Sequence, residues 1–227
     1  MTPAGPARVL EIICCSLEDA IAARDGGADR LELCAHLDLQ GLTPPLDLVE
    51  QIVRAVAVPV RVMIRLNDRF TATESELSAM ERQVAAFAAL PLDGLIFGLH
   101  DNTGRLDFAA MDRVLRHAPA QWGWTLHRAF DFAAGDAAEK LDAVTRHGRA
   151  DRILSADSWR LAPPPGLQFD FRFIAGGGLD ATNLHNYLDS PCREFHFGRA
   201  ARRTPDPLAP VDARRVGELR KILDRRL

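Results

Sequence analysis

Charged and imidazole side chains stand within short apolar stretches of this sequence, where they could carry acid/base chemistry. Glu11 lies in "LEIICC", Glu32 in "DRLELC" and His127 in "TLHRAF". Carboxylates and imidazoles transfer protons, and an arginine such as Arg65, at the end of "VPVRVMIR", stabilises negative charge that develops beside them. The candidate catalytic residues are therefore Glu11, Glu32, Arg65 and His127.

Strand alternation places further polar residues on the same inferred face. Side chains of a strand point alternately to its two faces, and in each stretch the opposite face is almost entirely apolar. The residues expected to face one interior are Glu11, Glu32, Arg65, Thr125, His127, Glu194 and His196. Buried charges are costly unless they are paired or used, so this set indicates either a functional site or a salt-bridge network in which Arg65 neutralises Glu11 or Glu32.

Glycine-rich and basic segments late in the sequence indicate a place for an anion. "AGGG" (175–178) ends one apolar stretch, and "FGRAAR" (197–202) follows the next. The backbone amides of Gly176 and Gly177 and the guanidinium of Arg199 could hold a phosphate or a carboxylate. The candidate residues for binding a small anionic substrate are Thr125, Ser155, Gly176, Gly177, Glu194, His196 and Arg199.

Eight apolar runs of strand length must position these groups, and helical patterns lie between most of them. The runs cover residues 8–15, 29–34, 58–65, 92–100, 124–130, 151–155, 171–178 and 193–198. One helical pattern begins with Ser16 as N-cap and stops at Gly26, and another covers "DATNLHNYLD" (180–189). Alternating strands and helices predict a parallel sheet, and eight such units predict an α/β fold of the TIM type, a (β/α)8 barrel in one domain over residues 1–227.

One unit of the predicted barrel is incomplete. Between the sixth and seventh runs the chain reads "WRLAPPPGLQFD", and Pro163, Pro164 and Pro165 are incompatible with a normal crossover helix. The sixth helix is therefore expected to be missing or reduced. Trp159, the loop itself or a partner subunit would cover the barrel wall there, and a homo-oligomer is expected.

Composition excludes several classes of partner. The chain has 227 residues, 47% of them hydrophobic and 26% charged, with a formal net charge of −3, so no basic field for nucleic acid is present. No apolar stretch approaches the length of a membrane span. Its four cysteines show neither a CxxC pair nor zinc-finger spacing, which predicts reduced thiols in a cytoplasmic protein.

The sequence resembles the CutC family, known as copper homeostasis proteins. The matching segments are "GGADRLELC", "GLTP", "VMIR", "TLHRAFD", "AGGG" and "EFHFGRAAR". The resemblance implies a TIM-type barrel and a cytoplasmic role in copper handling, with Cu(I) bound by cysteines near the first two strands. The family commonly has a cysteine where this chain has Ile13, followed here by Cys14 and Cys15. Cys34 matches, and parity turns Cys15 inward near it and Cys14 outward.

Three functions follow from these observations. A copper-homeostasis protein would bind Cu(I) through Cys34 and Cys15, with Cys14 as the alternative ligand, because soft thiolates suit Cu(I). An enzyme would act on a small anionic substrate by acid/base chemistry in the barrel mouth. A non-catalytic oligomeric scaffold would instead show an empty, internally salt-bridged barrel.

Overall fold

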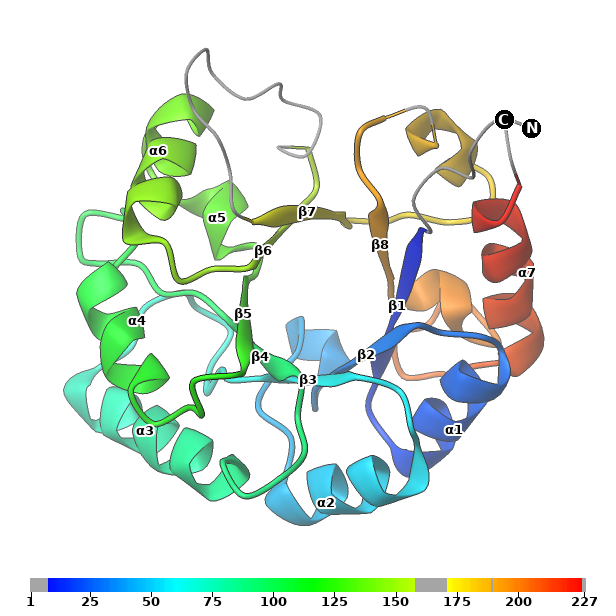
Figure 1. Cartoon of the computed structure of the whole chain (residues 1–227), viewed down its shortest axis with the longest axis horizontal. Helices are drawn as coiled ribbons and strands as arrows, with labels where there is room; N and C mark the ends of the chain where they lie inside the picture. Colours follow the sequence, from blue (N-terminus) through cyan, green and yellow to red (C-terminus); the bar gives the residue numbers. More distant parts are fainter. Residues whose placement is uncertain (1–7, 158–170, 189, 226–227) are drawn as a thin grey trace.

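Eight parallel strands close into a barrel in chain order (Figure 1). This computed structural model describes residues 8–157, 171–188 and 190–225. Each strand pairs with its neighbour in the sequence, and β8 pairs with β1 to complete the ring. The strands are β1 (Val9–Cys14), β2 (Arg30–Leu33), β3 (Val60–Met63), β4 (Gly94–Phe97), β5 (Gly123–Leu126), β6 (Arg152–Ser155), β7 (Arg172–Ala175) and β8 (Glu194–Phe197). The predicted TIM-type barrel is confirmed.

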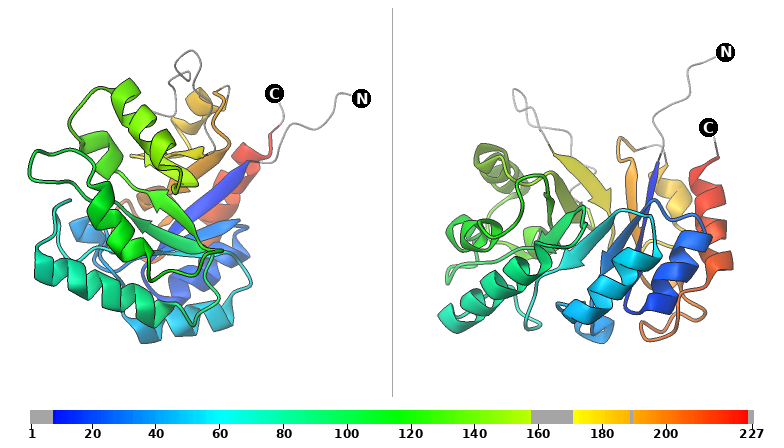
Figure 2. Two further views of the ribbon diagram at one scale, coloured as in Figure 1. Left: turned by 60° about the vertical axis from the view of Figure 1, so that its left-hand side comes forward. Right: turned by 60° about the horizontal axis from the view of Figure 1, so that its bottom comes forward.

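Helices surround the strands on the outside of the barrel (Figures 1 and 2). The α-helices are α1 (Leu17–Asp25), α2 (Leu46–Ala55), α3 (Glu74–Phe87), α4 (Phe108–Leu115), α5 (Ala129–Phe132), α6 (Ala137–His147) and α7 (Ala213–Leu223). Short 3-10 helices are η1 (Leu37–Leu39), η3 (Leu184–Tyr187) and η4 (Arg199–Ala201). Arg8 donates from Nη1 to the carbonyl of Leu223 (2.9 Å), so the start of β1 is tied to the end of α7.

Side-chain caps begin α1 and α3, and the cap of α1 is Ser16, as the sequence predicts. Ser16 accepts a hydrogen bond from the backbone N–H of Asp19 (3.1 Å) at the start of α1, and Gly26 follows the last residue of that helix. Thr73 and Glu76 form a capping box at the start of α3. These side chains satisfy backbone N–H groups that have no partner within the helix.

Two apolar clusters lie on opposite sides of the sheet. The larger lies between the strands and the helices, and it includes Ile12 and Cys14 of β1 with Val49 of α2 and Phe87 of α3. The smaller lies inside the barrel and consists of Ile13, Cys34, Met63 and Ile96. The apolar face thus packs against the helices, as strand parity predicts.

The segment 180–189 does not form the predicted regular helix, and that prediction is wrong. Within its described residues, 180–188, the helical part is η3. The side chain of Asp180 accepts from the backbone N–H groups of Thr182 (2.8 Å) and Asn183 (3.0 Å), and Asn183 donates to the carbonyl of Gly178 (2.9 Å). Such local side-chain bonds compete with the helical hydrogen-bond pattern.

Two further predictions concern the sixth helix and membrane-spanning segments. The expected loss of the sixth helix, with Pro163, Pro164, Pro165 and Trp159, lies outside the described residues. Over the ranges that the structure does describe, no helix combines the length and the apolar character that crossing a membrane requires.

Candidate functional site

The thiols of Cys15 and Cys34 meet at the barrel mouth, which is the rim formed by the carboxyl ends of the strands. The two residues directly follow β1 and β2, whose parallel register aligns Cys14 with Leu33. The Sγ atoms of Cys15 and Cys34 are 3.8 Å apart. Cys14 packs outward in the main core instead. The orientations that parity predicts for the three cysteines are confirmed.

The two facing thiols differ in acidity. The hydrogen bond from Cys34 lowers the pKa of Cys15; burial opposes this shift, and the positive charge of Arg202, whose Nη2 is 3.7 Å from the sulfur, supports it. The same hydrogen bond and then burial raise the pKa of Cys34 well above its usual value. The pair therefore favours a thiolate on Cys15 and a proton on Cys34, and the thiolate is the form that binds metals.

Arg202 and Asp19 hold the end of β1 that carries Cys15. Asp19 accepts from the backbone N–H of Cys15 (3.0 Å) and from Arg202 Nη1 (3.2 Å). Arg202 also donates to the carbonyl of Ile13 (3.3 Å), and both charged side chains are buried. Sequence reasoning missed these two residues; the one available signal for Arg202 was its place at the end of "FGRAAR".

A solvent-open hollow of about 200 Å³ leads to Cys15. Its lining includes Cys15, Ser16, Asp19, His36, Leu37 and Arg202. On the inner side, Cys34 packs with Met63 in the apolar cluster inside the barrel. The thiol pair is thus reachable from solvent on one side and dry on the other, and its donors are soft ligands of the kind that select Cu(I).

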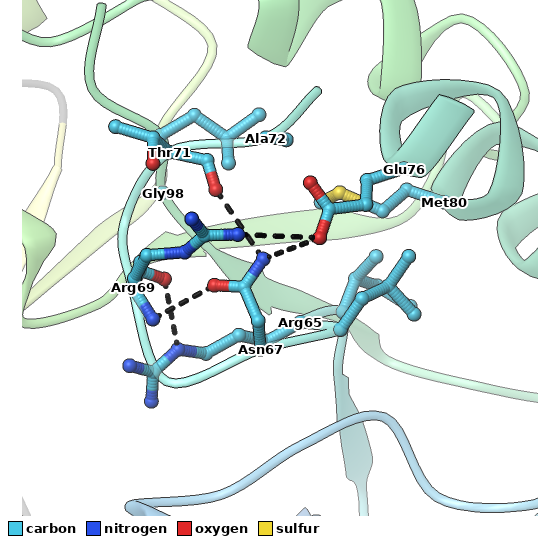
Figure 3. Close-up of a pocket in the computed structure, with 11 residues that line it drawn as sticks. Arg65, Asn67, Arg69, Thr71, Ala72, Glu76, Met80 and Gly98 are labelled. Carbon is cyan, nitrogen blue, oxygen red and sulfur yellow. Dashed lines mark hydrogen bonds and ion pairs between the residues drawn. The ribbon is translucent and has the colours of Figure 1, made fainter. Parts of the chain in front are cut away.

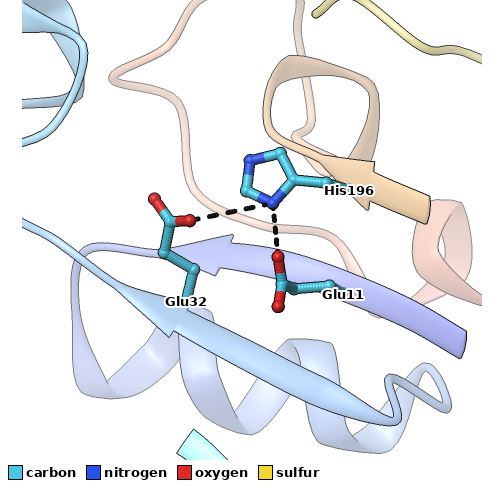
Figure 4. A group of neighbouring side chains, drawn as sticks. All are labelled: Glu11, Glu32 and His196. Carbon is cyan, nitrogen blue, oxygen red and sulfur yellow. Dashed lines mark hydrogen bonds and ion pairs between the residues drawn. The ribbon is translucent and has the colours of Figure 1, made fainter. Parts of the chain in front are cut away.

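Deeper in the barrel, Glu11, Glu32 and His196 form a second cluster (Figure 4). His196 Nδ1 is 2.7 Å from Glu11 Oε1 and 3.8 Å from Glu32 Oε2. Burial opposes ionisation of Glu11, but Arg30 and His196 hold its pKa well below the usual range. Burial raises the pKa of Glu32 to about 7, although His196 opposes this shift. Burial disfavours the charged form of His196, yet Glu32 and Glu11 raise its pKa.

Arg30 supplies the counter-charge for Glu11, so the idea that Arg65 neutralises Glu11 or Glu32 is wrong. The Arg30 guanidinium pairs with Glu11 through Nε and with Glu194 Oε2 through Nη2 (2.6 Å). Glu194 also pairs with Arg152 Nε (2.7 Å). Sequence reasoning missed Arg30, although it precedes Glu32 by two residues in "DRLELC" and strand parity therefore turns it inward.

A second missed arginine, Arg61, fills the barrel between β3 and β5. It donates to Asp93 Oδ2 (2.6 Å), to Asp151 Oδ2 (2.6 Å) and to the hydroxyl of Thr125 (2.7 Å). Gly123 leaves the necessary room, because a Cβ at that position would lie 2.2 Å from Arg61 Nη2. Thr125 therefore faces inward as predicted, where its hydroxyl accepts a hydrogen bond from Arg61.

Arg65 lies apart from the carboxylate cluster, in the loops of the mouth (Figure 3). Its guanidinium donates to the backbone carbonyls of Asp68 (2.6 Å) and Gln40 (3.3 Å) and lies 5.0 Å from the ring centre of Phe70. The adjoining hollow has a volume of about 10 Å³, and side chains that bond one another line it, as Asn67 donates to Glu76 (2.8 Å).

His127 packs against the same aromatic ring, 5.3 Å from Phe70 between ring centres. Its Nδ1 accepts from the backbone N–H of Ala129 (3.2 Å), which assigns the proton of the neutral ring to Nε2. Nε2 is buried and has no hydrogen-bond partner among the described residues. Burial and then the charge of Arg65 lower the pKa of His127 to about 3. The four candidate catalytic residues thus fall into two groups, Glu11 with Glu32 and Arg65 with His127.

The remaining predicted ligands of an anion are spread over several places. Ser155 donates to Asp131 Oδ1 (2.5 Å) of α5. Gly176 is buried beside His196, and a Cβ there would lie 2.6 Å from Leu154 Cδ1. Gly177 has a φ of 82°, which favours glycine, and Arg199 is exposed at the start of η4.

The fold and these groups define a (β/α)8-barrel protein with a thiol pair at its mouth and buried carboxylates deeper inside. Residues 8–161, more than half of the chain, match the sequence model of the CutC family. The chain belongs to the CutC family.

Solved structures with the same fold are distant in sequence. The protein from Streptococcus agalactiae that carries the name copper homeostasis protein CutC is 22% identical, with a TM-score of 0.71 over 83% of this chain and 97% of that one. Phosphoribosylanthranilate isomerase from Thermotoga maritima is 12% identical, with a TM-score of 0.59 over 94% and 97%. A Rubisco-like protein from Rhodopseudomonas palustris is 14% identical, with a TM-score of 0.66 over 98% and 66%. These similarities show that the chain shares the barrel fold of the three proteins.

Proposed function

We propose that this protein binds Cu(I) between Cys15 and Cys34 and acts in copper homeostasis. The observation that carries the proposal is the 3.8 Å separation of the two sulfur atoms. Metal–sulfur bonds of about 2.3 Å, the length found for zinc, allow one ion to join two sulfurs at that distance. Membership of the CutC family and the name of the S. agalactiae protein support the role in copper homeostasis.

The surroundings of the pair support a soft monovalent ion. The hydrogen bond from Cys34 and the cationic Arg202 lower the pKa of Cys15, which favours its thiolate, and the apolar side chains of Ile13 and Met63 line the inner side. Ile13 removes the thiol that relatives of this chain commonly carry at its position, and Cys15 supplies one nearer the mouth. Copper reaches it through the hollow beside Cys15. All four cysteines are free thiols, and we propose the cytoplasm, where thiols stay reduced, as the location.

Anaerobic titration with Cu(I) against a competing chelator tests the proposal. The wild type is expected to take up one Cu(I) per chain, and Cys15→Ser and Cys34→Ser are each expected to lower the affinity at least 100-fold. Cys192→Ser is the matched control, because Cys192 is a buried thiol that bonds backbone carbonyls elsewhere in the fold. Unchanged affinity in both site variants would contradict the proposal.

A second candidate is the binding of a small anionic substrate beside His127. The specific observation is the buried Nε2–H of His127, which has no acceptor in the part of the chain that the structure describes, with the guanidinium of Arg65 in the same loop region. Buried donors of this kind are normally satisfied, so a carbonyl or an oxyanion is the expected partner. A thermal shift assay with inorganic phosphate tests this candidate. A rise in the melting temperature of the wild type that is absent in His127→Asn would support it, and equal rises in the two proteins would contradict it.

A further inference from the structure

Buried and half-buried charged side chains of the barrel form one chain of alternating charge, and one end of that chain lacks an arginine. It runs from Asp93 through Arg61, Asp151, Arg152, Glu194 and Arg30 to Glu11, with each neighbouring pair in direct contact. Every carboxylate up to Glu11 touches at least one arginine. His196 and Glu32 continue the chain beyond Glu11 without a further arginine.

Glu32 differs from the other carboxylates of this network, because each of those contacts an arginine. Glu32 is 3% exposed to solvent. Its Oε2 atom has no hydrogen-bond partner among the described residues. The ion pair that it makes there is the long contact of 3.8 Å with His196. Burying a carboxylate oxygen without a donor is costly, so an unmatched oxygen of this kind indicates a missing cation or proton.

The charges of the chain indicate where positive charge is lacking. Five carboxylates, those of Asp93, Asp151, Glu194, Glu11 and Glu32, face four guanidinium groups, those of Arg61, Arg152, Arg30 and Arg172, the last of which lies 3.4 Å from Glu194 Oε1. Within the described part of the chain, the ion pair of Glu32 is the one with His196. A cation bound beside Glu32 would supply the positive charge that this end of the network lacks.

We propose that Glu11, Glu32 and His196 form a binding site for a divalent transition-metal ion such as Zn²⁺, separate from the thiol pair at the mouth. One ligand atom from each residue lies within 4.8 Å of the others (Figure 4). Zinc bonds of about 2.1 Å to nitrogen and oxygen place tetrahedral ligands roughly 3.4 Å apart. The observed 2.7 Å and 3.8 Å from His196 Nδ1 lie on either side of that value, so small side-chain rotations suffice.

The surroundings and the donor types fit such an ion. Arg30 bonds the other oxygen of Glu11, Oε2, and so holds the carboxylate with Oε1 turned to the site, as an outer-shell partner of a metal ligand does. Two carboxylates with one imidazole suit divalent first-row metals, whereas Cu(I) prefers sulfur. Three protein ligands would leave one coordination position of Zn²⁺ open for water or a substrate.

Zn²⁺ binding in a Cys15→Ser/Cys34→Ser background tests the proposal without interference from the thiols at the mouth. Competition against a fluorescent chelator is expected to give one tight site per chain. Glu32→Gln and His196→Asn are each expected to weaken it at least 100-fold. His147→Asn, which removes an imidazole paired with Asp112 near the surface, is the matched control and should leave the affinity within twofold.

A second measurement keeps the three ligands intact. In the same background, ¹⁵N spectra of the histidine side chains should show a shift of the His196 Nδ1 resonance that saturates at one equivalent of Zn²⁺. Three results would each overturn the proposal: no tight site, an unchanged affinity in Glu32→Gln, or a His196 resonance that does not shift with Zn²⁺. Protons would then supply the missing positive charge.

Discussion

The sulfur atoms of Cys15 and Cys34 lie 3.8 Å apart, although 19 positions separate the residues in the sequence. The parallel pairing of β1 with β2 brings them together, because each cysteine directly follows its strand on the inner face. The soft donors therefore gather at the mouth, while the carboxylates and His196 lie farther back along the strands. The two proposals above therefore place two kinds of metal chemistry at two depths of one barrel.

Cys15 should be the most reactive thiol of the chain. Its pKa is lowered by the hydrogen bond from Cys34 and, against the effect of burial, by Arg202, and it is the one cysteine that is not fully buried. Burial raises the pKa values of Cys14 and Cys192. Iodoacetamide at pH 7.5, followed by mass spectrometry of peptides, should label Cys15 at least tenfold faster than the other three. Cys34→Ala should slow this labelling, because the thiolate of Cys15 loses its donor; equal rates at all four thiols would refute the assignment.

Arg30 should be essential for stability. Arg30→Ala would leave Glu11 and Glu194 as buried carboxylates without their shared partner, and breaking a buried ion pair in this way costs about 3–5 kcal/mol. The control is Arg54→Ala, which removes an exposed pair with Glu50 and should cost less than about 1 kcal/mol. Urea unfolding followed by circular dichroism measures both. Similar costs for the two variants would mean that the barrel network contributes little.

Glu32→Gln should stabilise the metal-free protein at high pH. The pKa of Glu32 rises from 4.5 to about 7 on folding, so the free energy of unfolding of the wild type falls as the pH increases from about 4.5 through 7. Glu32→Gln does not lose stability in this way. At pH 8 its free energy of unfolding should exceed that of the wild type by roughly 3 kcal/mol, since one pKa unit corresponds to about 1.4 kcal/mol. Urea unfolding at pH 5 and pH 8 with a chelator present measures the difference. A variant that is less stable than the wild type at pH 8 would show that Glu32 is matched after all.

His127 should make the fold sensitive to acid. Its pKa falls from 6.5 to about 3 on folding, so protons bind the unfolded state first, and stability is lost as the pH drops below 6.5. His127→Asn keeps an acceptor for the N–H of Ala129 but does not titrate. Between pH 7 and pH 5 the wild type should lose about 2 kcal/mol more than the variant. Parallel pH profiles for the two proteins would contradict a buried neutral His127.

The barrel could be predicted from sequence because its strand signals are local. All eight apolar runs overlap an observed strand, and the caps at Ser16 and Gly26 stand where expected. The segment 180–189 could not be predicted as well, because its apolar spacing resembles a helix while Asp180 and Asn183 bond neighbouring backbone groups. The oligomeric state stays a prediction.

The sequence predicts which side chains of the site face the barrel interior, but not which groups they contact. Parity placed Glu11, Glu32, His196, Cys15 and Cys34 on the inner face, since alternation along a strand is fixed by backbone geometry. Parity could not predict which charges pair, because the partners of Arg30, Arg61 and Arg202 lie on other elements of the fold, as Asp19 of α1 does for Arg202. Arg65 has the right parity, yet carbonyl groups of the mouth loops bind its guanidinium.

X-ray absorption at the copper edge tests the central claim most directly. Wild-type protein loaded with one equivalent of Cu(I) under reducing, anaerobic conditions should show a first coordination shell made of sulfur, and this shell should be lost in Cys15→Ser/Cys34→Ser. A first shell of nitrogen and oxygen, or a sulfur shell that survives the double substitution, would contradict Cu(I) binding between Cys15 and Cys34.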